Sequence, residues 1–290
     1  MTIKKVAVVC NTGLGDAILF ERLAHALSEE GKQCTVFGHY LEKFSSWYPY
    51  IEFKNYPEDI ENPFSSFWSY YDGYIFQEYA PGSHVIRLNK WVLGENYRLK
   101  NESWRMHQER FLKDIFGIEN PRVVSSIKAP EGYEFRKFPK RVLIHPTSLK
   151  EEKNWPVKKF IALAQQLKLE GYDPCFCVSE GEKELWQGYL KSTQLALYVL
   201  PLSELCALVY ESGYFIGNDS GISHLASALG IPSLKIFDRA SRARFWSGGW
   251  DRSHEVTPWP LPSRLLRVKY WKNFLSVARV LRRFKELTAH

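Results

Sequence analysis

A strand–turn–helix–strand pattern occupies residues 6–38, which read VAVVCNTGLGDAILFERLAHALSEEGKQCTVFG. Val6–Val9 is a short apolar run of the kind found in strands that are buried on both faces. Residues 11–16 form a turn, and residues 17–30 show the apolar spacing of an amphipathic helix. Because residues 34–38 supply a second strand, the stretch predicts a βαβ unit and a parallel sheet.

The same alternation restarts after residue 140. Strands are predicted at 142–145, 175–178, 197–200, 214–217 and 233–237, with helices at 157–170, 182–190, 203–212 and 222–229. The stretch 128–140 contains Pro130, Gly132 and Pro139 and is typical of an interdomain linker. We therefore predict an α/β protein with two domains, residues 1–135 and 136–290, each a Rossmann-like doubly wound sheet.

The aromatic-rich stretch between the two patterns gives fewer signals. It predicts one strand at 74–76 and one helix at 102–116. The chain of 290 residues is 45% hydrophobic and 24% charged, which excludes a disordered chain, a collagen-like repeat and a small disulfide scaffold.

Cysteine usage and hydropathy indicate a cytoplasmic protein. Five cysteines form no even framework, and Cys175 and Cys177 are expected to be reduced core residues on one face of a strand. No apolar run approaches the roughly 18 residues that a membrane span needs. The short apolar run at 6–10 is followed by Asn11 and Asp16, so no secretory signal is expected.

The net charge of +7 is concentrated in the C-terminal segment. Residues 239–290 carry 12 Lys or Arg against 3 Asp or Glu, and a helix predicted at 270–287 combines basic and apolar positions. Nucleic acid, anionic lipid headgroups or a phosphorylated substrate would each suit this charge, as would a solvated helix face. No motif that reads DNA or RNA is present, so no nucleic-acid partner is predicted.

Ligands of parallel sheets bind beyond the carboxyl ends of the strands, so the candidate residues lie there. They are Gly13, Gly15 and Asp16 after the first strand, Thr147, Ser148 and Lys153 after the strand at 142–145, and Asp219, Ser220, Gly221 and His224 after the strand at 214–217. Each group also has a purely structural interpretation. Asp16 and the Asp219–Ser220 pair are common helix caps, and residues 147–153 could form a charged surface loop.

The run GNDSGISHLASALGIP at 217–232 resembles the signature D-(T/S)-G-x-x-H-L-A-x-A-L-x-x-P of glycosyltransferase family 9, the heptosyltransferase-like enzymes. Gly15-Asp16 and Lys153-Asn154-Trp155-Pro156 match two further landmarks of that family in the same order. The resemblance spans most of residues 1–237. It implies a GT-B architecture, in which two Rossmann-like domains flank an interdomain cleft. The first domain would bind the acceptor and the second the nucleotide sugar.

The resemblance also implies inverting transfer without a required metal or cofactor. Asp16 would act as general base on an acceptor hydroxyl, which requires an ionised carboxylate within hydrogen-bond reach. Lys153, the Thr147 and Ser148 hydroxyls, and the backbone N–H groups of Ser220 and Gly221 would stabilise the leaving nucleoside diphosphate. The implied donor-binding set is Thr147, Ser148, Lys153, Glu182, Asp219, Ser220, Gly221 and His224. Glu182, or alternatively Glu180, would contact the ribose, with Gly13 and Gly15 in the acceptor-side loop.

The implied reaction moves heptose from ADP-heptose to a lipopolysaccharide core or related glycan or glycolipid, at the inner face of the cytoplasmic membrane. A different nucleotide sugar, or a non-catalytic protein that binds a nucleotide sugar, remains an alternative. The sequence departs from the family pattern in a shorter N-terminal half, a longer loop at 147–153 and a basic stretch at 238–246. The C-terminal helix is expected to pack across the domains, with its basic positions facing an anionic membrane or a phosphorylated glycan.

Overall fold

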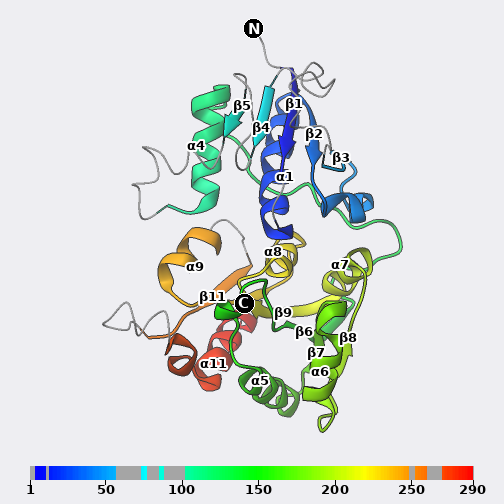
Figure 1. Cartoon of the computed structure of the whole chain (residues 1–290), viewed down its shortest axis with the longest axis vertical. Helices are drawn as coiled ribbons and strands as arrows, with labels where there is room; N and C mark the ends of the chain where they lie inside the picture. The colour runs from blue at the N-terminus through cyan, green and yellow to red at the C-terminus, as the bar shows by residue number, and fades with distance from the viewer. Residues whose placement is uncertain are drawn as a thin grey trace. The chain divides into compact units, whose positions relative to one another are not determined.

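The computed structural model describes residues 4–10, 13–56, 73–76, 85–87, 102–247, 252–259 and 270–289. Asn11 and Thr12 of the predicted turn lie outside these ranges. The chain divides into two compact units, Met1–Pro130 and Glu131–His290 (Figure 1). Each unit contains one sheet, and every strand pair in the two sheets is parallel.

The first unit is built on a sheet with the strand order β3-β2-β1-β4-β5. Its strands are β1 (Lys5–Val9), β2 (Gln33–Phe37), β3 (Glu52–Lys54), β4 (Gly73–Phe76) and β5 (Val85–Arg87). The central strand β1 pairs Val6 with Cys34 on one side and with Gly73 on the other. The predicted βαβ unit and its parallel sheet are therefore confirmed.

The helices of this unit within the described residues are α1 (Leu14–Glu29), the short η1 (Leu41–Trp47) and α4 (Trp104–Phe116). A buried polar contact joins α1 to the segment after α4. The Arg22 Nη2 donates to the Val123 carbonyl at 2.6 Å. The Glu21 carboxylate accepts from the Ser126 backbone N–H at 2.9 Å and from the Ser125 hydroxyl at 2.7 Å. Burial raises the pKa of Glu21 above its ordinary value, although these hydrogen bonds oppose the shift.

The second unit has a sheet with the order β11-β10-β9-β6-β7-β8. Its strands are β6 (Phe138–His145), β7 (Asp173–Cys177), β8 (Ala196–Tyr198), β9 (Ser212–Asn218), β10 (Ser233–Ile236) and β11 (Ser253–Val256). Among the described residues, its helices include η3 (Glu151–Lys153), α5 (Val157–Leu169), η4 (Glu180–Glu182), α6 (Lys183–Leu190), α7 (Leu202–Tyr210), α8 (Gly221–Ala228), α9 (Ala240–Ser247) and α11 (Val277–Thr288). All five strands predicted after residue 140 are present.

Two glycines let β9 approach β6 closely. A Cβ at Gly213 would lie 2.1 Å from the Pro139 carbonyl oxygen, and one at Gly217 would lie 2.9 Å from the His145 carbonyl oxygen. Since backbone oxygens cannot move away as a flexible side chain can, neither position accommodates a side chain. The five cysteines are free and buried, as predicted, and burial raises the pKa of the Cys175 thiol to about 12.

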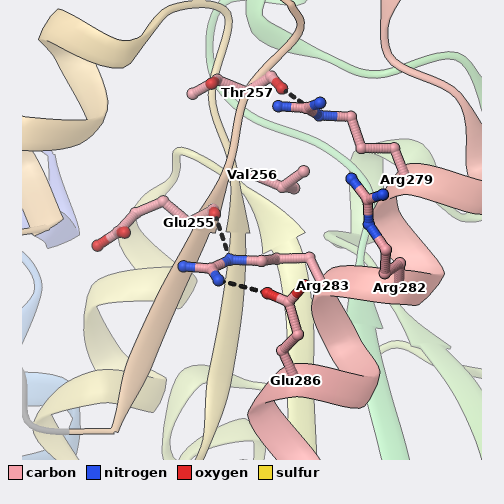
Figure 2. Close-up of a pocket in the computed structure, with 7 residues that line it drawn as sticks. All are labelled: Glu255, Val256, Thr257, Arg279, Arg282, Arg283 and Glu286. Atoms are coloured by element: carbon pink, nitrogen blue, oxygen red, sulfur yellow. Dashed lines mark hydrogen bonds and ion pairs between the residues drawn. The ribbon is translucent and has the colours of Figure 1, made fainter.

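The C-terminal helix differs from the prediction of one continuous helix at 270–287. Residues 270–274 are helical, the helix stops at Leu275, and Ser276 caps α11 by accepting from the Arg279 N–H at 3.2 Å. α11 packs within the second unit, against α5 and along β11 (Figure 2). Its Phe284 meets the rings of Tyr172 and Tyr214 edge-on. No helix within the described ranges is long and apolar enough to cross a membrane.

Candidate functional site

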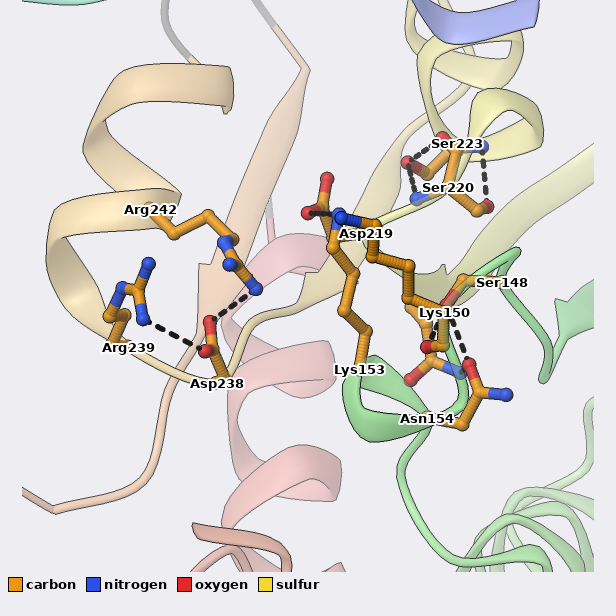
Figure 3. A network of polar contacts seen from close by, with 11 residues as sticks. Ser148, Lys150, Lys153, Asn154, Asp219, Ser220, Ser223, Asp238, Arg239 and Arg242 are labelled. Atoms are coloured by element: carbon orange, nitrogen blue, oxygen red, sulfur yellow. Dashed lines mark hydrogen bonds and ion pairs between the residues drawn. The ribbon is translucent and has the colours of Figure 1, made fainter. Parts of the chain in front are cut away.

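An ion pair lies at the carboxyl ends of β6 and β9. Lys153 Nζ donates to Asp219 Oδ2 at 2.7 Å (Figure 3). Lys153 ends the short helix η3 after β6, and Asp219 follows β9 directly. The Asp219 side chain is 7% exposed and that of Lys153 is 23% exposed. The pair therefore holds a partly accessible ammonium group at the edge of the sheet where ligands of this fold class bind.

Asn218 fixes the loop that carries Lys153. It is the last residue of β9 and is fully buried. Its Nδ2 donates to the Pro146 carbonyl at 2.6 Å, and its Oδ1 accepts from the Trp155 N–H at 3.1 Å. One amide side chain thus holds both ends of the loop between β6 and α5. The sequence analysis missed Asn218, although it directly precedes the Asp219 motif.

The same loop positions the two predicted hydroxyl groups. Ser148 Oγ lies 2.7 Å from Asn154 Oδ1, so its hydroxyl donates within the loop. The buried Thr147 donates to Glu182 Oε2 at 3.3 Å. Glu182 also forms a capping box with Ser179 at the start of η4. The predicted residue Glu182 is therefore held beside Thr147, whereas the alternative Glu180 is exposed and paired with Lys183.

His145, at the end of β6, is a hydrogen-bond donor in this structure. Its Nδ1 lies 2.9 Å from the Cys177 carbonyl, which only accepts, so this nitrogen carries the proton. Burial lowers the pKa of His145 below its ordinary value of 6.5, although the bond to Cys177 opposes the shift. The imidazole ring thereby ties β6 to β7 beside the predicted donor residues.

Helix α8 begins with a capping box. Ser220 Oγ accepts from the Ser223 N–H at 3.4 Å, and the Ser220 N–H lies 3.2 Å from Ser223 Oγ. In this structure Ser223 Oγ accepts the Ser220 N–H, and the binding of a ligand by that N–H stays a prediction. The Gly221 N–H belongs to the first turn, whose donors have no partner within the helix. His224, one turn further, is 5% exposed, and its ring faces that of Trp246 at a centroid distance of 6.4 Å.

Arginines from the basic stretch at 238–246 face the same end of the sheet. Arg242 Nη1 lies 3.1 Å from Asp238 Oδ1, and Arg239 Nη1 lies 3.5 Å from Asp238 Oδ2 (Figure 3). In the sheet register Ile236 pairs with Asn218, so Asp238 and Asp219 both follow the ends of neighbouring strands. The sequence alone marked this stretch only as a departure from the family pattern. Two basic residues four positions or fewer from Asp238 were the available signal.

The segment before α11, residues 271–275, forms hydrogen bonds with the loop that carries Lys153. Trp271 Nε1 donates to the Glu152 carbonyl at 3.0 Å, and Lys272 Nζ donates to the Glu151 carbonyl at 3.0 Å. Trp155 Nε1 donates in return to the Leu275 carbonyl at 3.0 Å. These contacts fix the backbone of η3, the helix that presents the Lys153 side chain.

Asp16 belongs to the first unit and lies in the first turn of α1. The N-cap of α1 is Gly13, without a side-chain hydrogen bond, so the interpretation of Asp16 as the N-cap is wrong. Gly15 also lies inside the first turn. The Asp16 side chain is half-buried and lies at the end of the helix whose dipole attracts negative charge. Of the predicted residues, Thr147, Ser148, Lys153, Glu182, Asp219, Ser220, Gly221 and His224 belong to the second unit, and Gly13, Gly15 and Asp16 belong to the first.

A comparison with protein-family models decides the family. Residues 96–258, more than half of the chain, match the model described as "Glycosyltransferase family 9 (heptosyltransferase)". The chain belongs to glycosyltransferase family 9. It is therefore a glycosyltransferase, as the 217–232 signature predicted. A separate search of curated proteins found no match.

Solved structures confirm the GT-B fold of this glycosyltransferase. A family 9 glycosyltransferase from Veillonella parvula has a TM-score of 0.75 and 16% identity, covering 99% of this chain and 97% of that one. The ADP-heptose lipopolysaccharide heptosyltransferase II of E. coli has a TM-score of 0.66 and 15% identity, covering 98% of each chain. TibC from enterotoxigenic E. coli, an iron-containing dodecameric glycosyltransferase, has a TM-score of 0.63 and 15% identity, covering 99% of this chain and 76% of that one.

Proposed function

We propose that this glycosyltransferase moves heptose from ADP-heptose to a lipopolysaccharide-core or related glycan acceptor, with inversion and without a required metal. The observation that carries the proposal is the Lys153–Asp219 ion pair beside the first turn of α8. A cation and free helix N–H groups at one sheet edge are what a departing diphosphate needs. The donor base and sugar are further supported by the heptosyltransferase II neighbour, which is named for ADP-heptose.

The acceptor would be activated from the first unit. The Asp16 carboxylate takes the proton of an acceptor hydroxyl as that oxygen attacks the anomeric carbon. The bond between this carbon and the diphosphate oxygen breaks on the opposite face, so the anomeric configuration inverts. Residues 1–135 are the acceptor-binding domain in this proposal, and Gly13 and Gly15 let the acceptor approach the backbone.

The leaving nucleoside diphosphate would be stabilised from the second unit. Lys153 Nζ and the Gly221 N–H take up the charge that develops on the diphosphate, while Asp219 keeps Lys153 in position. Arg242, held by Asp238 at the same sheet edge, supplies a further cation. The Thr147 and Ser148 hydroxyls turn to the phosphates, Glu182 accepts from the ribose, and His224 lies near the diphosphate or sugar.

Metal independence is a separate part of the proposal. The cations of this chain's own side chains take the place of a divalent ion in the mechanism. Within the described ranges, no three His, Cys, Asp or Glu side chains gather as metal ligands would. The TibC neighbour is described as iron-containing, so the proposal requires a direct test: transfer measured with and without a chelator should proceed at the same rate.

We also propose a cytoplasmic location with peripheral contact at the inner face of the membrane. A glycolipid acceptor would be reached there, and the exposed basic positions of α11 would attract anionic lipids.

The first test is a thermal-shift panel with ADP-heptose, ADP, and UDP- and GDP-sugars. A ligand that binds only the folded state at a hundredfold excess over Kd stabilises it by roughly 2.7 kcal/mol. We expect a shift with ADP-heptose and ADP alone, followed by ADP release when a heptose-free core acceptor is added. If a UDP- or GDP-sugar stabilised the protein instead, the proposed transferase activity would stand and ADP-heptose would no longer be its donor. The absence of a shift with every member would contradict the donor site.

A further inference from the structure

A second polar recess lies outside the site described above. It has a volume of about 350 Å³ and opens between the edge strand β11 and helix α11 (Figure 2). Its lining consists of Glu255, Val256, Thr257, Arg279, Arg282, Arg283 and Glu286. Three arginines from one helix thus face a cavity of the size of a small ligand site.

Two of these arginines are fixed by backbone carbonyls of β11 and of Thr257, the residue that follows it. Arg279 Nε donates to the Thr257 carbonyl at 2.9 Å, and Arg283 Nε donates to the Glu255 carbonyl at 3.1 Å. Carbonyls two residues apart on a strand point the same way, roughly 6.6 Å apart, and four residues of helix rise about 6 Å. The spacing of the helix therefore matches that of the strand, and both guanidinium groups are held with defined orientations.

These two hydrogen bonds leave most of the N–H donors of Arg279 and Arg283 unused. A guanidinium group has five N–H donors, and one of these is spent on each carbonyl. Arg279 also stacks over the Trp259 ring at 4.2 Å. The positions of Arg279 and Arg283 are explained by the open backbone carbonyls at the edge of the sheet, which these side chains satisfy. This explanation does not account for the exposed Arg282, which forms no hydrogen bond or ion pair with any residue that the structure describes.

The charges in the recess are predominantly positive. Arg283 pairs with the Glu286 carboxylate at 2.5 Å, and this bond holds the pKa of Glu286 below its ordinary value. The Glu255 carboxylate points away, to the far side of β11, in Figure 2. Three guanidinium groups therefore face one carboxylate, and the excess positive charge favours an anion.

We propose that the recess between β11 and α11 binds a phosphate ester, with Arg279 and Arg283 as its fixed walls and Arg282 as the residue that closes on the anion. The planar fork of arginine matches the oxygens of a phosphate group. The volume suits a phosphorylated headgroup or a sugar phosphate. The ligand is either an anionic lipid headgroup or a soluble phosphate ester. The proposal stands on the recess alone and does not require the transfer reaction proposed above.

The test uses the full chain and two probes, glycerol 3-phosphate in solution and phosphatidylglycerol in phosphatidylcholine vesicles. Both are measured in a Lys153→Ala background, which removes the cation of the other site. Arg282→Ala is compared with Lys285→Ala, a control on the same helix that loses the same charge. Lys285 pairs with Glu170 at 2.7 Å and does not line the recess.

We expect Arg282→Ala to weaken binding roughly tenfold, as the loss of a hydrogen bond between charged groups does, and Lys285→Ala to leave it unchanged. Saturable binding of glycerol 3-phosphate would assign the recess to a soluble ester, and binding to vesicles alone would assign it to a headgroup. Equal losses in the two variants would show a diffuse charge effect and overturn the proposal. It would also be overturned if neither probe bound.

Discussion

Two turns of this molecule have similar sequences and different constructions. Both β1–α1 and β9–α8 connect a parallel strand to a helix and place an aspartate near a glycine. After β9, Asp219 precedes the helix, pairs with Lys153 at 2.7 Å, and stands beside a capping box made by Ser220. After β1, Gly13 caps the helix without a side-chain hydrogen bond, and Asp16 lies inside the first turn.

The difference separates a carboxylate that is paired with a neighbouring cation from the one to which the proposed function gives the role of general base. Asp219 is 7% exposed and has a cation as its partner, so its charge is committed to that cation. Asp16 is half-buried in the first turn of α1, where the helix dipole interacts favourably with a negative charge. The comparison therefore predicts that the two aspartates fail in different ways when they are changed.

Of the substitutions that test the difference between the two aspartates, Asp16→Asn should have the largest effect. It keeps the shape and removes the base, so the rate of transfer should fall about a hundredfold or more. Nucleotide affinity should stay at the wild-type value, because the proposed nucleotide site belongs to the other unit. The lost charge at the helix N-terminus should cost no more than about 1 kcal/mol of stability. The measurements are initial rates of transfer and nucleotide titration. The exposed Glu30→Gln, at the other end of α1, is the control. Equal losses of binding and rate in Asp16→Asn would instead make Asp16 a structural residue.

The substitution Gly213→Ala tests the rigid strand pair that supports the second turn. The new Cβ would lie 2.1 Å from the Pro139 carbonyl oxygen, so β6 and β9 must separate. We expect a loss of about 3 kcal/mol, seen as a fall in Tm on the order of 10 °C. Gly188→Ala in α6 is the matched control, since nothing lies within 4 Å of its Cβ. It should stabilise the helix by about 0.5–1 kcal/mol. A wild-type Tm for Gly213→Ala would refute the close approach.

The substitution Lys153→Ala sharpens the interpretation of the ion pair. It removes a cation from the diphosphate and leaves the buried Asp219 carboxylate unpaired, so nucleotide affinity should fall about ten- to hundredfold. Asp219→Asn should also weaken binding. The double variant should lose less than the sum of the two, because the residues act as a pair. Calorimetric titration with ADP measures each variant, with the exposed Lys158→Ala as control. Additive losses would mean that Asp219 does not position Lys153.

A smaller effect distinguishes the two units by pH. Burial raises the pKa of Glu21 in the first unit and lowers that of His145 in the second. The stability contributed by Glu21 is present below its unfolded pKa and is lost as pH rises through the raised value. The contribution of His145 is present above 6.5 and is lost as pH falls toward the lowered value.

Acidification from pH 7 to 5 should therefore favour the first unit through Glu21 and weaken the second through His145. Hydrogen exchange in α1 and in α5 reports on the two units separately. Glu21→Gln and His145→Asn should each flatten the response of their own unit and leave that of the other unit unchanged. If both variants retained the wild-type pH response, the shifts would have another origin.

The sequence predicted those elements whose local pattern and tertiary environment agree. The buried strands β1, β6, β7, β9 and β10 are apolar runs bounded by turn residues, and each was found near its predicted position. Strand β11 was missed because Ser253, His254 and Glu255 give it a polar surface pattern, and pairing with β10 alone makes it a strand. Helix α9 was missed because its apolar residues do not follow one face.

The sequence identified the residues of the candidate site, but it could not predict which of them contact one another. Motif spacing identified Lys153 and Asp219, but nothing local shows that they meet across 66 positions. The hydrogen bonds by which Asn218 holds the loop between β6 and α5 depend in the same way on the order of the strands, and so does the Asp238–Arg242 pair. Only the folded sheet sets that order. The break at Ser276 was missed because the apolar spacing continues across it, while a serine hydroxyl starts a new helix there.

The hydrogen bonds from Trp271 and Lys272 to the backbone of η3 set an order of events during synthesis. Glu151 and Glu152, which receive the hydrogen bonds of Lys272 and Trp271, leave the ribosome more than a hundred residues before those side chains are made. Phe284 and Leu287, which complete the core of the second unit, come later still. A nascent chain that already contains Lys153, Asn218 and Asp219 therefore still lacks the contacts that the C-terminal segment makes to the backbone of η3. A truncation before residue 270 should keep every residue of the candidate site and lose these contacts, so that the Lys153–Asp219 pair is held less firmly.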